Sequence, residues 1–287
     1  MIHRRLALAL PGLLLGLPLT ACAGPEAAPD GAPSPSSAGA GLELATEGLR
    51  QGGFALGRVP PGSRVALDGR PVQVGPDGRF ALGFARDAAP EARLAVTLPD
   101  GRPQTRRLEI GRREWDVQRI SGLPQAMVSP NAQQLARIRQ ERERLAAIRK
   151  VDSDLPFFAE GFVWPARGRI SGVFGSQRIL NGEARAPHLG LDIAAPTGTP
   201  CAAMGGGRVL LAEDLYFTGH TVLLDHGHGV VSLYAHLSRI DVREGEMLAR
   251  GQGLGAIGAT GRVTGPHLHL GLNWLATAID PQPLLPA

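Results

Sequence analysis

The chain has 287 residues, with 30 lysines and arginines against 26 aspartates and glutamates and a formal net charge of +4. Arg4 and Arg5 belong to a basic start that a cleaved signal would remove, so the mature chain would be only mildly basic. This balance argues against a nucleic-acid-binding protein, and no base-reading motif or array of stacking aromatic residues accompanies it. The length predicts about two domains.

The N-terminus has the layout of an export signal over residues 1–21. Its apolar run, Leu6 to Leu17, is shorter than the roughly 20 residues of a membrane-spanning helix, and small residues follow it. Leu-Thr-Ala-Cys at residues 19–22 resembles a bacterial lipobox, in which Cys22 becomes the lipid-modified first residue of the mature chain. Simple secretion is the alternative. Ala23 is not the aspartate that typically retains lipoproteins in the inner membrane, so an outer-membrane anchor facing the periplasm is favoured.

Residues 22–41 are predicted to form a flexible tether, because nearly all of them are Ala, Gly, Pro or Ser. Such a segment cannot bury enough apolar surface to offset the entropy lost on ordering. If Cys22 carries lipid, it cannot pair with Cys201, the second of the two cysteines. Cys201 heads an apolar run and is predicted to be a buried free thiol.

Residues 42–120 are predicted to form a small Ig-like β-sandwich. Short β-rich segments alternate with turns, several of which contain Asp-Gly, a strong hairpin signal. The segments are 54–59, 64–67, 71–74, 79–84, 93–98 and 105–110. This region contains no histidine or cysteine, so we expect no catalytic constellation in it. Its arginines could contact an acidic polymer, but a solvated basic face is the favoured interpretation.

A linker at residues 121–154 is predicted to contain one amphipathic helix. Leu135, Ile138, Leu145 and Ile148 recur at helical spacing, and Asn131 is the predicted N-cap. The helix is too short for a stable coiled coil, so packing against a neighbouring domain is favoured. Contact of its basic face with anionic lipid or polymer is the alternative.

Residues 155–287 carry two pairs of candidate metal ligands on predicted short antiparallel strands. His267 and His269 alternate with leucines, so both side chains point to one face of a strand. His188 and Asp192 are of the kinds that a catalytic zinc takes as ligands. A fully extended chain would hold these two about 13 Å apart, so the backbone must bend, and Gly190 permits the bend.

A second His-x-His pattern, His226 and His228, is flanked by glycines. The glycines predict a hairpin turn in which both imidazoles face solvent and bind no metal. His220 follows Gly219 and receives the same interpretation.

The span from about residue 157 to 286 resembles the lysostaphin/LytM-type zinc metallopeptidases, a family of peptidoglycan endopeptidases. Several independent motifs carry the resemblance: Val-Phe-Gly at 173–175, His-x-Gly-x-Asp at 188–192, Ala-Ala-Pro-Thr-Gly-Thr-Pro at 194–200, Leu-Tyr-Ala-His-Leu-Ser at 233–238 and Thr-Gly-Pro-His-Leu-His at 264–269. The resemblance implies that His188, Asp192 and His269 bind one Zn²⁺ ion. It also implies that His236 and His267 flank the attacking water and the substrate carbonyl.

The predicted fold is therefore mainly β, with an N-terminal Ig-like sandwich, one linking helix and a C-terminal compact antiparallel β-domain of the LytM type. The predicted activity is metal-assisted hydrolysis of peptide crosslinks or stem peptides of peptidoglycan. A catalytically silent relative that activates another wall hydrolase is the first alternative, and a wall-binding lipoprotein is the second. The retention of all five polar residues favours an enzyme. Whether a regulatory protein partner exists stays open.

Overall fold

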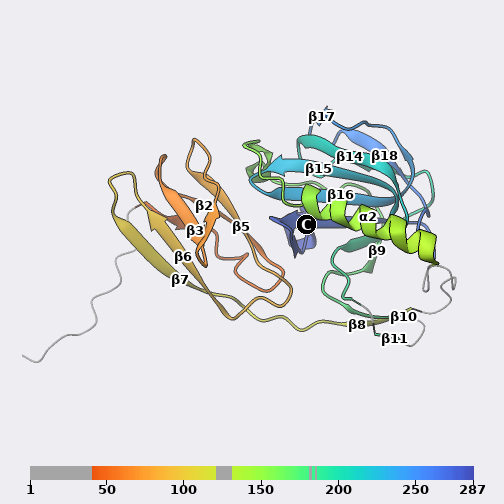
Figure 1. Ribbon diagram of the computed structural model, residues 1–287, viewed down its shortest axis with the longest axis horizontal. Coiled ribbons are helices and arrows are strands. Elements are labelled where there is room, and N and C mark those ends of the chain that lie inside the picture. The colour runs from red at the N-terminus through yellow and green to blue at the C-terminus, as the bar shows by residue number, and fades with distance from the viewer. Residues whose placement is uncertain (1–40, 121–130, 181–182, 185) are drawn as a thin grey trace, which may run out of the picture. The chain divides into compact units, whose positions relative to one another are not determined.

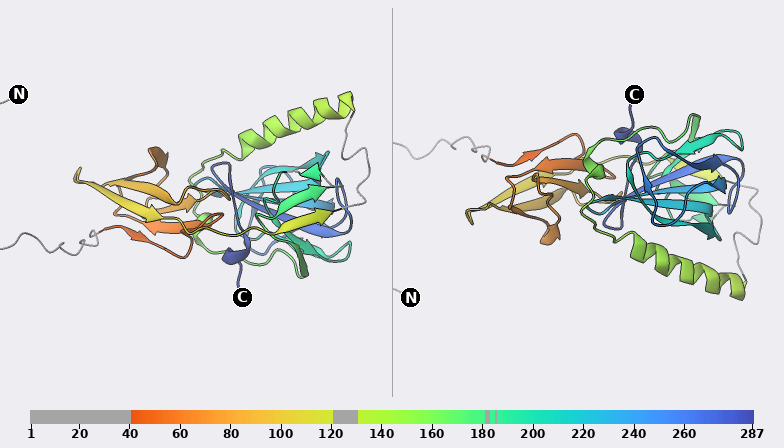
Figure 2. Two further views of the ribbon diagram at one scale, coloured as in Figure 1. Left: turned by 90° about the horizontal axis from the view of Figure 1, so that it is seen from below. Right: turned by 90° about the horizontal axis from the view of Figure 1, so that it is seen from above.

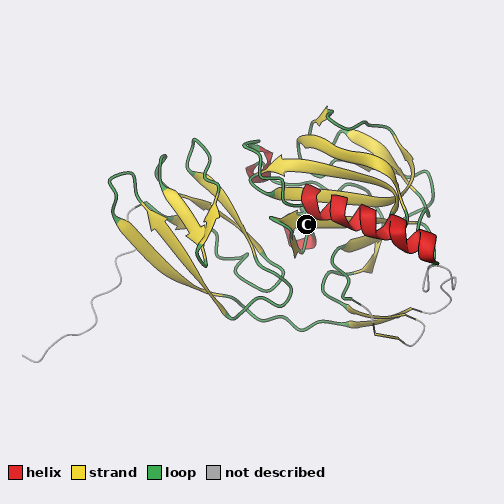
Figure 3. Ribbon diagram, viewed as in Figure 1, coloured by secondary structure: helices red, strands yellow, loops and turns green. Residues whose placement is uncertain are grey.

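The computed structural model describes residues 41–120, 131–180, 183–184 and 186–287, and strands are its main secondary structure (Figure 3). The predicted signal, Cys22 and nearly all of the tether lie outside these residues. Contacts group the described residues into one compact unit, so the boundaries predicted near residues 120 and 155 stay predictions. No helix in the described residues combines the length and apolar character needed to cross a membrane.

The first half forms the predicted sandwich from two antiparallel sheets (Figure 1). One sheet has the order β1-β2-β5 and the other has the order β4-β3-β6-β7. Their strands are β1 (Glu43–Leu44), β2 (Phe54–Arg58), β3 (Arg64–Leu67), β4 (Arg70–Val72), β5 (Arg79–Gly83), β6 (Glu91–Thr97) and β7 (Pro103–Glu109). Phe80, Leu82 and Leu94 are fully buried between the strands. All six predicted segments are strands, and the Asp68-Gly69 turn has φ values of +49° and +80°, as a two-residue hairpin turn requires.

The predicted helix is α2 (Ala132–Ile148). Asn131 caps it as predicted: its side chain accepts from the Gln134 N–H at 2.9 Å, and the Gln134 side chain accepts from the Asn131 N–H at 2.8 Å. Leu145 and Ile148 pack on a buried cluster that includes Leu211 and Leu223. The helix therefore covers β14 to β16 of the C-terminal sheet, and Figure 2 shows it on the outer side of these strands.

The second half is built on a ten-stranded sheet whose main path is β17-β14-β15-β16-β19-β12-β9. Its strands are β9 (Arg169–Gly172), β12 (Leu191–Ala194), β13 (Pro200–Ala202), β14 (Gly207–Leu215), β15 (Gly219–Gly227), β16 (Val230–Ile240), β17 (Met247–Leu248), β18 (Gly253–Ile257), β19 (His267–Trp274) and β20 (Thr277–Ile279). The 3-10 turns η1 (Phe157–Ala159) and η2 (Gln282–Leu284) flank it. All pairings in this sheet are antiparallel, as predicted. Cys201 is a buried free thiol, and burial raises its pKa to about 12.

A separate small sheet joins distant parts of the chain. It contains β8 (Val117–Ile120), β10 (Gln177–Leu180) and β11 (Glu183–Ala184), in the order β11-β10-β8. β8 runs parallel to β10, with Gln118 opposite Arg178. A segment that follows the sandwich thus forms one edge of the region around β9 and β12.

The prediction that His226 and His228 face solvent is wrong. His226 has no exposed surface and His228 is 3 % exposed, because η1 and the following loop cover the end of the β15–β16 hairpin. Phe158 stacks on His228 at 4.1 Å between ring centroids, and Phe162 meets His226 edge-on at 5.5 Å. Neither histidine belongs to the metal-ligand cluster found in the described residues.

His226 is held in its neutral form by two hydrogen bonds. Its Nδ1–H donates to the Gly206 carbonyl oxygen at 2.6 Å, which leaves Nε2 to accept from the Ser232 hydroxyl at 2.8 Å. The Ser232 hydroxyl lies 3.1 Å from the Tyr234 hydroxyl, and all three side chains are buried. Burial lowers the pKa of His226, because a charged imidazole would lose its hydration there.

We expect acid to destabilise the fold through His226. The unfolded chain gains a proton near the ordinary histidine pKa of about 6.5, whereas the folded chain resists it. The contribution to stability is therefore complete above that pH and decreases below it, by at most about 1.4 kcal/mol per pH unit for one group. Urea unfolding of the metal-free protein at about pH 7.5 and about pH 5 measures the change. His226→Asn, which does not titrate, should weaken the pH dependence, and an unchanged dependence would contradict this assignment.

Candidate metal centre and active site

The loop before β12 brings His188 and Asp192 together. His188 Nε2 lies 3.0 Å from Asp192 Oδ1, so the chain does bend between them. The His188 N–H donates to the Ser176 carbonyl oxygen at 2.9 Å, and the Gly175 N–H donates to the His188 carbonyl oxygen at 2.7 Å. These two bonds tie the loop to the segment after β9 and fix the backbone of His188.

β19 supplies His269 to the same point. Asp192 and His269 are register partners on the antiparallel pair β12–β19. His269 Nδ1 lies 2.7 Å from Asp192 Oδ1 and 3.1 Å from His188 Nε2. The three predicted ligands thus place one donor atom each around a common point, and they form the one such cluster found in the described residues.

This donor set fits a zinc ion. Tetrahedral bonds of about 2.0–2.1 Å would separate neighbouring donors by about 3.3 Å, close to the spacings of 2.7, 3.0 and 3.1 Å here. His188 Nδ1–H donates to the Val173 carbonyl oxygen at 3.1 Å, so Nε2 keeps its lone pair for a metal. Burial by itself raises the pKa of Asp192, but hydrogen bonds with His188 and His269 outweigh it and hold the pKa well below the ordinary value. The carboxylate is therefore charged and suited to bind a cation.

Two glycines leave the space that the three ligands occupy. A Cβ atom at Gly172 would lie 2.5 Å from Asp192 Oδ2, and one at Gly190 would lie 2.5 Å from His269 Cε1. Gly190 has no positive φ, so its absent side chain matters more than a special backbone conformation. The sequence correctly singled out Gly190, but for a bend rather than for this close approach.

His236 and His267 lie beside the ligand cluster with matching hydrogen bonds. His236 Nδ1 bonds to the Thr260 carbonyl oxygen and His267 Nδ1 to the Gly265 carbonyl oxygen, each at 2.9 Å. Because a carbonyl only accepts, each Nδ1 carries the proton and each Nε2 is left as an acceptor. The ring centroids lie 4.8 Å apart, and His267 Nε2 is 3.9 Å from Asp192 Oδ1.

His236 is held in an environment that favours the neutral imidazole. Burial and, to a smaller extent, the neighbouring His269 and His267 together lower its pKa to about 3. Its φ is +65°, an uncommon conformation for residues other than glycine, although asparagine, aspartate and histidine adopt it more often than the rest. The His236 N–H donates to the Thr218 carbonyl oxygen at 2.8 Å and helps to hold this conformation. Strained residues of this kind cluster at functional sites.

A groove of about 190 Å³ opens over these residues. It exposes Asp192, His236, His267 and His269 to a substrate, whereas His188 is 1 % exposed and lies beneath them. The remaining lining residues, none of which was predicted as a site residue, come from β8, β9, β10 and the loop before β19: Gln118, Ser171, Arg178, Arg262, Val263 and Thr264. No local pattern marks the first of these, since β8 reaches the groove only through its pairing with β10.

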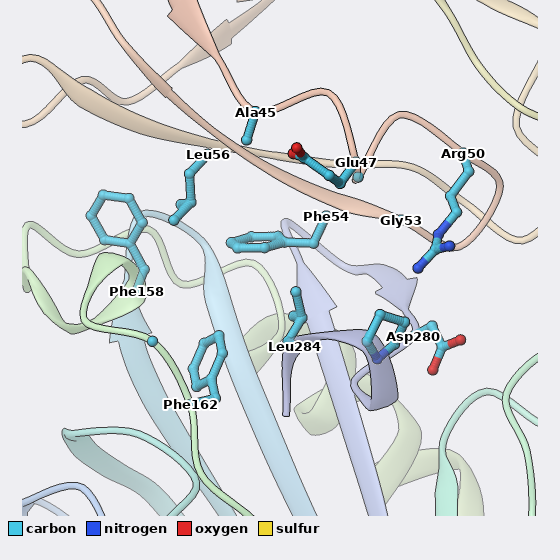
Figure 4. Close-up of a pocket in the computed structure, with 13 residues that line it drawn as sticks. Ala45, Glu47, Arg50, Gly53, Phe54, Leu56, Phe158, Phe162, Asp280 and Leu284 are labelled. Atoms are coloured by element: carbon cyan, nitrogen blue, oxygen red, sulfur yellow. The ribbon is translucent and has the colours of Figure 1, made fainter. Parts of the chain in front are cut away.

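A second cavity, of about 270 Å³, is mainly apolar and contains none of the candidate metal-binding or catalytic residues (Figure 4). Figure 4 shows Phe54 and Leu56 from β2 on one side and Phe158 and Phe162 on the other. Its one buried carboxylate, Asp280, pairs with Arg113 at 2.9 Å. The residues that line this cavity include no histidine or cysteine.

Comparisons with known proteins agree on the region that holds the site. Residues 186–281 match the model of peptidase family M23. A solved peptidase M23 from Pseudomonas aeruginosa is 32 % identical, with a TM-score of 0.64 over 81 % of this chain and 93 % of that one. The peptidoglycan DD-endopeptidase ShyA of Vibrio cholerae is 43 % identical over 105 residues, which are 36 % of this chain and 24 % of ShyA. The lipoprotein NlpD/LppB homolog of Pseudomonas aeruginosa is 36 % identical over 129 residues, 44 % of this chain and 40 % of that protein. The chain thus matches about a quarter of the length of ShyA and less than half of the lipoprotein homolog.

Proposed function

Because this chain is a member of peptidase family M23, we propose that it is a zinc-dependent endopeptidase that hydrolyses peptide crosslinks or stem peptides of bacterial peptidoglycan. One observation carries the proposal: His188, Asp192 and His269 converge on one point, and two further histidines with free Nε2 atoms stand next to them. The name of the ShyA relative supports peptidoglycan as the substrate.

The three converging residues would hold the zinc ion. When bound, zinc supplies a Lewis acid that polarises a carbonyl group and makes a water molecule more acidic. His236 and His267 then handle the protons of the reaction. One of the two Nε2 atoms accepts a proton from the attacking water, and the imidazolium formed in this way gives that proton to the leaving amine nitrogen as the amide bond breaks, so the ring ends neutral again. The carbonyl bonds at both Nδ1 atoms keep the rings oriented for this exchange.

A catalytically silent member of the family that activates another wall hydrolase is the competing proposal. Such a protein acts through the surface of the fold. Its function would not require the metal-ligand and proton-transfer side chains to keep their relative positions. The matched hydrogen bonds of His236 and His267 favour an enzyme, because a binding surface has no use for two proton acceptors held in fixed orientations.

Defined substrates separate the two proposals. The full chain, loaded with one equivalent of zinc, is incubated with a purified crosslinked muropeptide dimer, and the products are analysed by mass spectrometry. We expect cleavage to monomers, its loss after chelation and its return when zinc is added back. A folded, zinc-loaded chain that leaves both the dimer and intact sacculi uncut, yet accelerates an added wall hydrolase, would establish the silent activator instead.

We also propose that the chain is a lipoprotein anchored through Cys22 in the outer membrane and facing the periplasm. The Leu-Thr-Ala-Cys sequence supports it, and so does the relative named as a lipoprotein. We expect the mature protein to begin at Cys22 and to carry acyl chains, as measured by mass spectrometry of its N-terminal peptide. Cys22→Ala should release the protein from the membrane fraction. Recovery of an unmodified Cys22 peptide, or of a different N-terminus, would contradict the anchor.

A further inference from the structure

The two oxygens of the Asp192 carboxylate have different partners. Oδ1 lies 2.7 Å from His269 Nδ1 and 3.0 Å from His188 Nε2, so it points to the proposed zinc position. Oδ2 lies 3.1 Å from Arg178 Nη2. One oxygen therefore belongs to the ligand cluster, and the other belongs to an ion pair.

Arg178 is itself placed beside a second polar side chain. It lies on β10 directly opposite Gln118 of β8 in the parallel pairing, and both side chains line the groove. The Nε of Arg178 and the Oε1 of Gln118 are both buried without a hydrogen-bond partner among the described residues. One is a donor and the other an acceptor, so neighbouring positions carry complementary groups that can satisfy each other.

Contacts on the β9 side hold this arrangement close to the carboxylate. Gln118 Nε2 donates to the Ser171 carbonyl oxygen at 3.4 Å, and the Ser171 hydroxyl donates to the Asp192 carbonyl oxygen at 3.4 Å. The next residue, Gly172, leaves open the space around Asp192 Oδ2. β8, β9 and β10 thus meet beside Asp192.

We propose that Arg178 and Gln118 are positioning residues for Asp192. This proposal rests on the zinc-dependent function proposed above. Arg178 binds Oδ2 and so keeps Oδ1 turned to His188 and His269, and Gln118 orients the Arg178 guanidinium in turn. Partners that orient a metal ligand in this way commonly change metal affinity about 10–100-fold when removed. β8, which follows the sandwich, therefore influences the orientation of Asp192 through Gln118 and then Arg178.

The test measures zinc affinity of the full chain by competition with a chromogenic chelator, and it needs no turnover. We expect Arg178→Gln to raise the zinc Kd about 10–100-fold and Gln118→Met to raise it by a smaller factor. Because Gln118 acts through Arg178, the double variant should bind zinc about as weakly as Arg178→Gln alone. Cobalt-loaded Arg178→Gln should also show a shifted visible absorption spectrum, since the carboxylate is free to change its binding mode.

Arg262→Gln is the matched control, because it removes one positive charge from the same groove while the Arg178–Asp192 ion pair stays in place. Loss of a positive charge alone would tighten cation binding. We therefore expect Arg178→Gln to weaken zinc binding and Arg262→Gln to strengthen it or leave it unchanged. An unchanged or lower zinc Kd in folded Arg178→Gln overturns the positioning role and leaves the hydrolase proposal standing. Should Arg178→Gln fail to fold, Gln118→Met decides alone: an unchanged zinc Kd in that variant overturns the proposal. Inactivity of the unmodified chain on peptidoglycan, with these shifts present, would refute the hydrolase and not the positioning role.

Discussion

Replacing His269 by Ala is expected to remove zinc and hydrolytic activity together. The same result is expected for His188→Ala and Asp192→Ala, because each removes one of three protein ligands and leaves a two-residue site. A lost ligand should weaken zinc binding by more than the roughly 10–100-fold that a lost orienting partner costs. Elemental analysis of zinc per chain after dialysis, and cleavage of the muropeptide dimer, measure the two effects on one preparation.

Folding has to be checked separately for these variants. The three side chains lie between β12, β19 and the loop before β12, so removing one also removes hydrogen bonds within the apo protein. Circular dichroism and thermal unfolding in the presence of chelator report that change. A folded His269→Ala variant that keeps one zinc per chain and full activity would contradict the ligand assignment.

Replacing His236 or His267 by Ala is expected to abolish most activity while the metal stays bound. The expected loss is about 10²–10⁴-fold in rate, the usual range for removing a positioned acid or base or a transition-state hydrogen bond. Zinc content should stay at one per chain, because neither residue belongs to the cluster of converging donor atoms. The contrast between bound metal and lost activity separates proton transfer from metal binding.

The conformation of His236 calls for a second substitution at that position. Its φ of +65° suits Asn better than Ala, so His236→Asn removes the imidazole with less effect on the backbone. Both variants should lose activity to a similar extent.

If folded His267→Ala loses zinc while His269→Ala keeps it, the two assignments on β19 are reversed.

The sequence was sufficient for the parts of the site that short-range geometry controls. Alternation along residues 265–271 placed His267 and His269 on one face, and both line the groove. Periodicity alone did not assign them different roles; the predicted division came from a resemblance to known peptidases. The pairing of Asp192 with His269 across β12 and β19 places His269, and not His267, in the cluster of converging donor atoms, but it joins residues too far apart in sequence for periodicity to predict.

Two misses have the same physical origin. His226 and His228 looked like turn residues because glycines flank them, yet η1 and the loop after it bury them from elsewhere in the chain. β8 was not predicted as a strand, because its partner is β10 and the pairing is parallel and non-local. In both places, tertiary contacts override what the local sequence indicates.

The site requires glycine at positions 172 and 190 in addition to its polar residues. A chain could keep all five of His188, Asp192, His236, His267 and His269 and still lose the site through one added methyl group, because either Cβ would lie 2.5 Å from a ligand side chain. Inactive relatives can therefore arise in evolution by gain of a carbon atom as well as by loss of a ligand. Sorting active from inactive sequences of this kind means reading positions 172 and 190 together with the histidines and the aspartate.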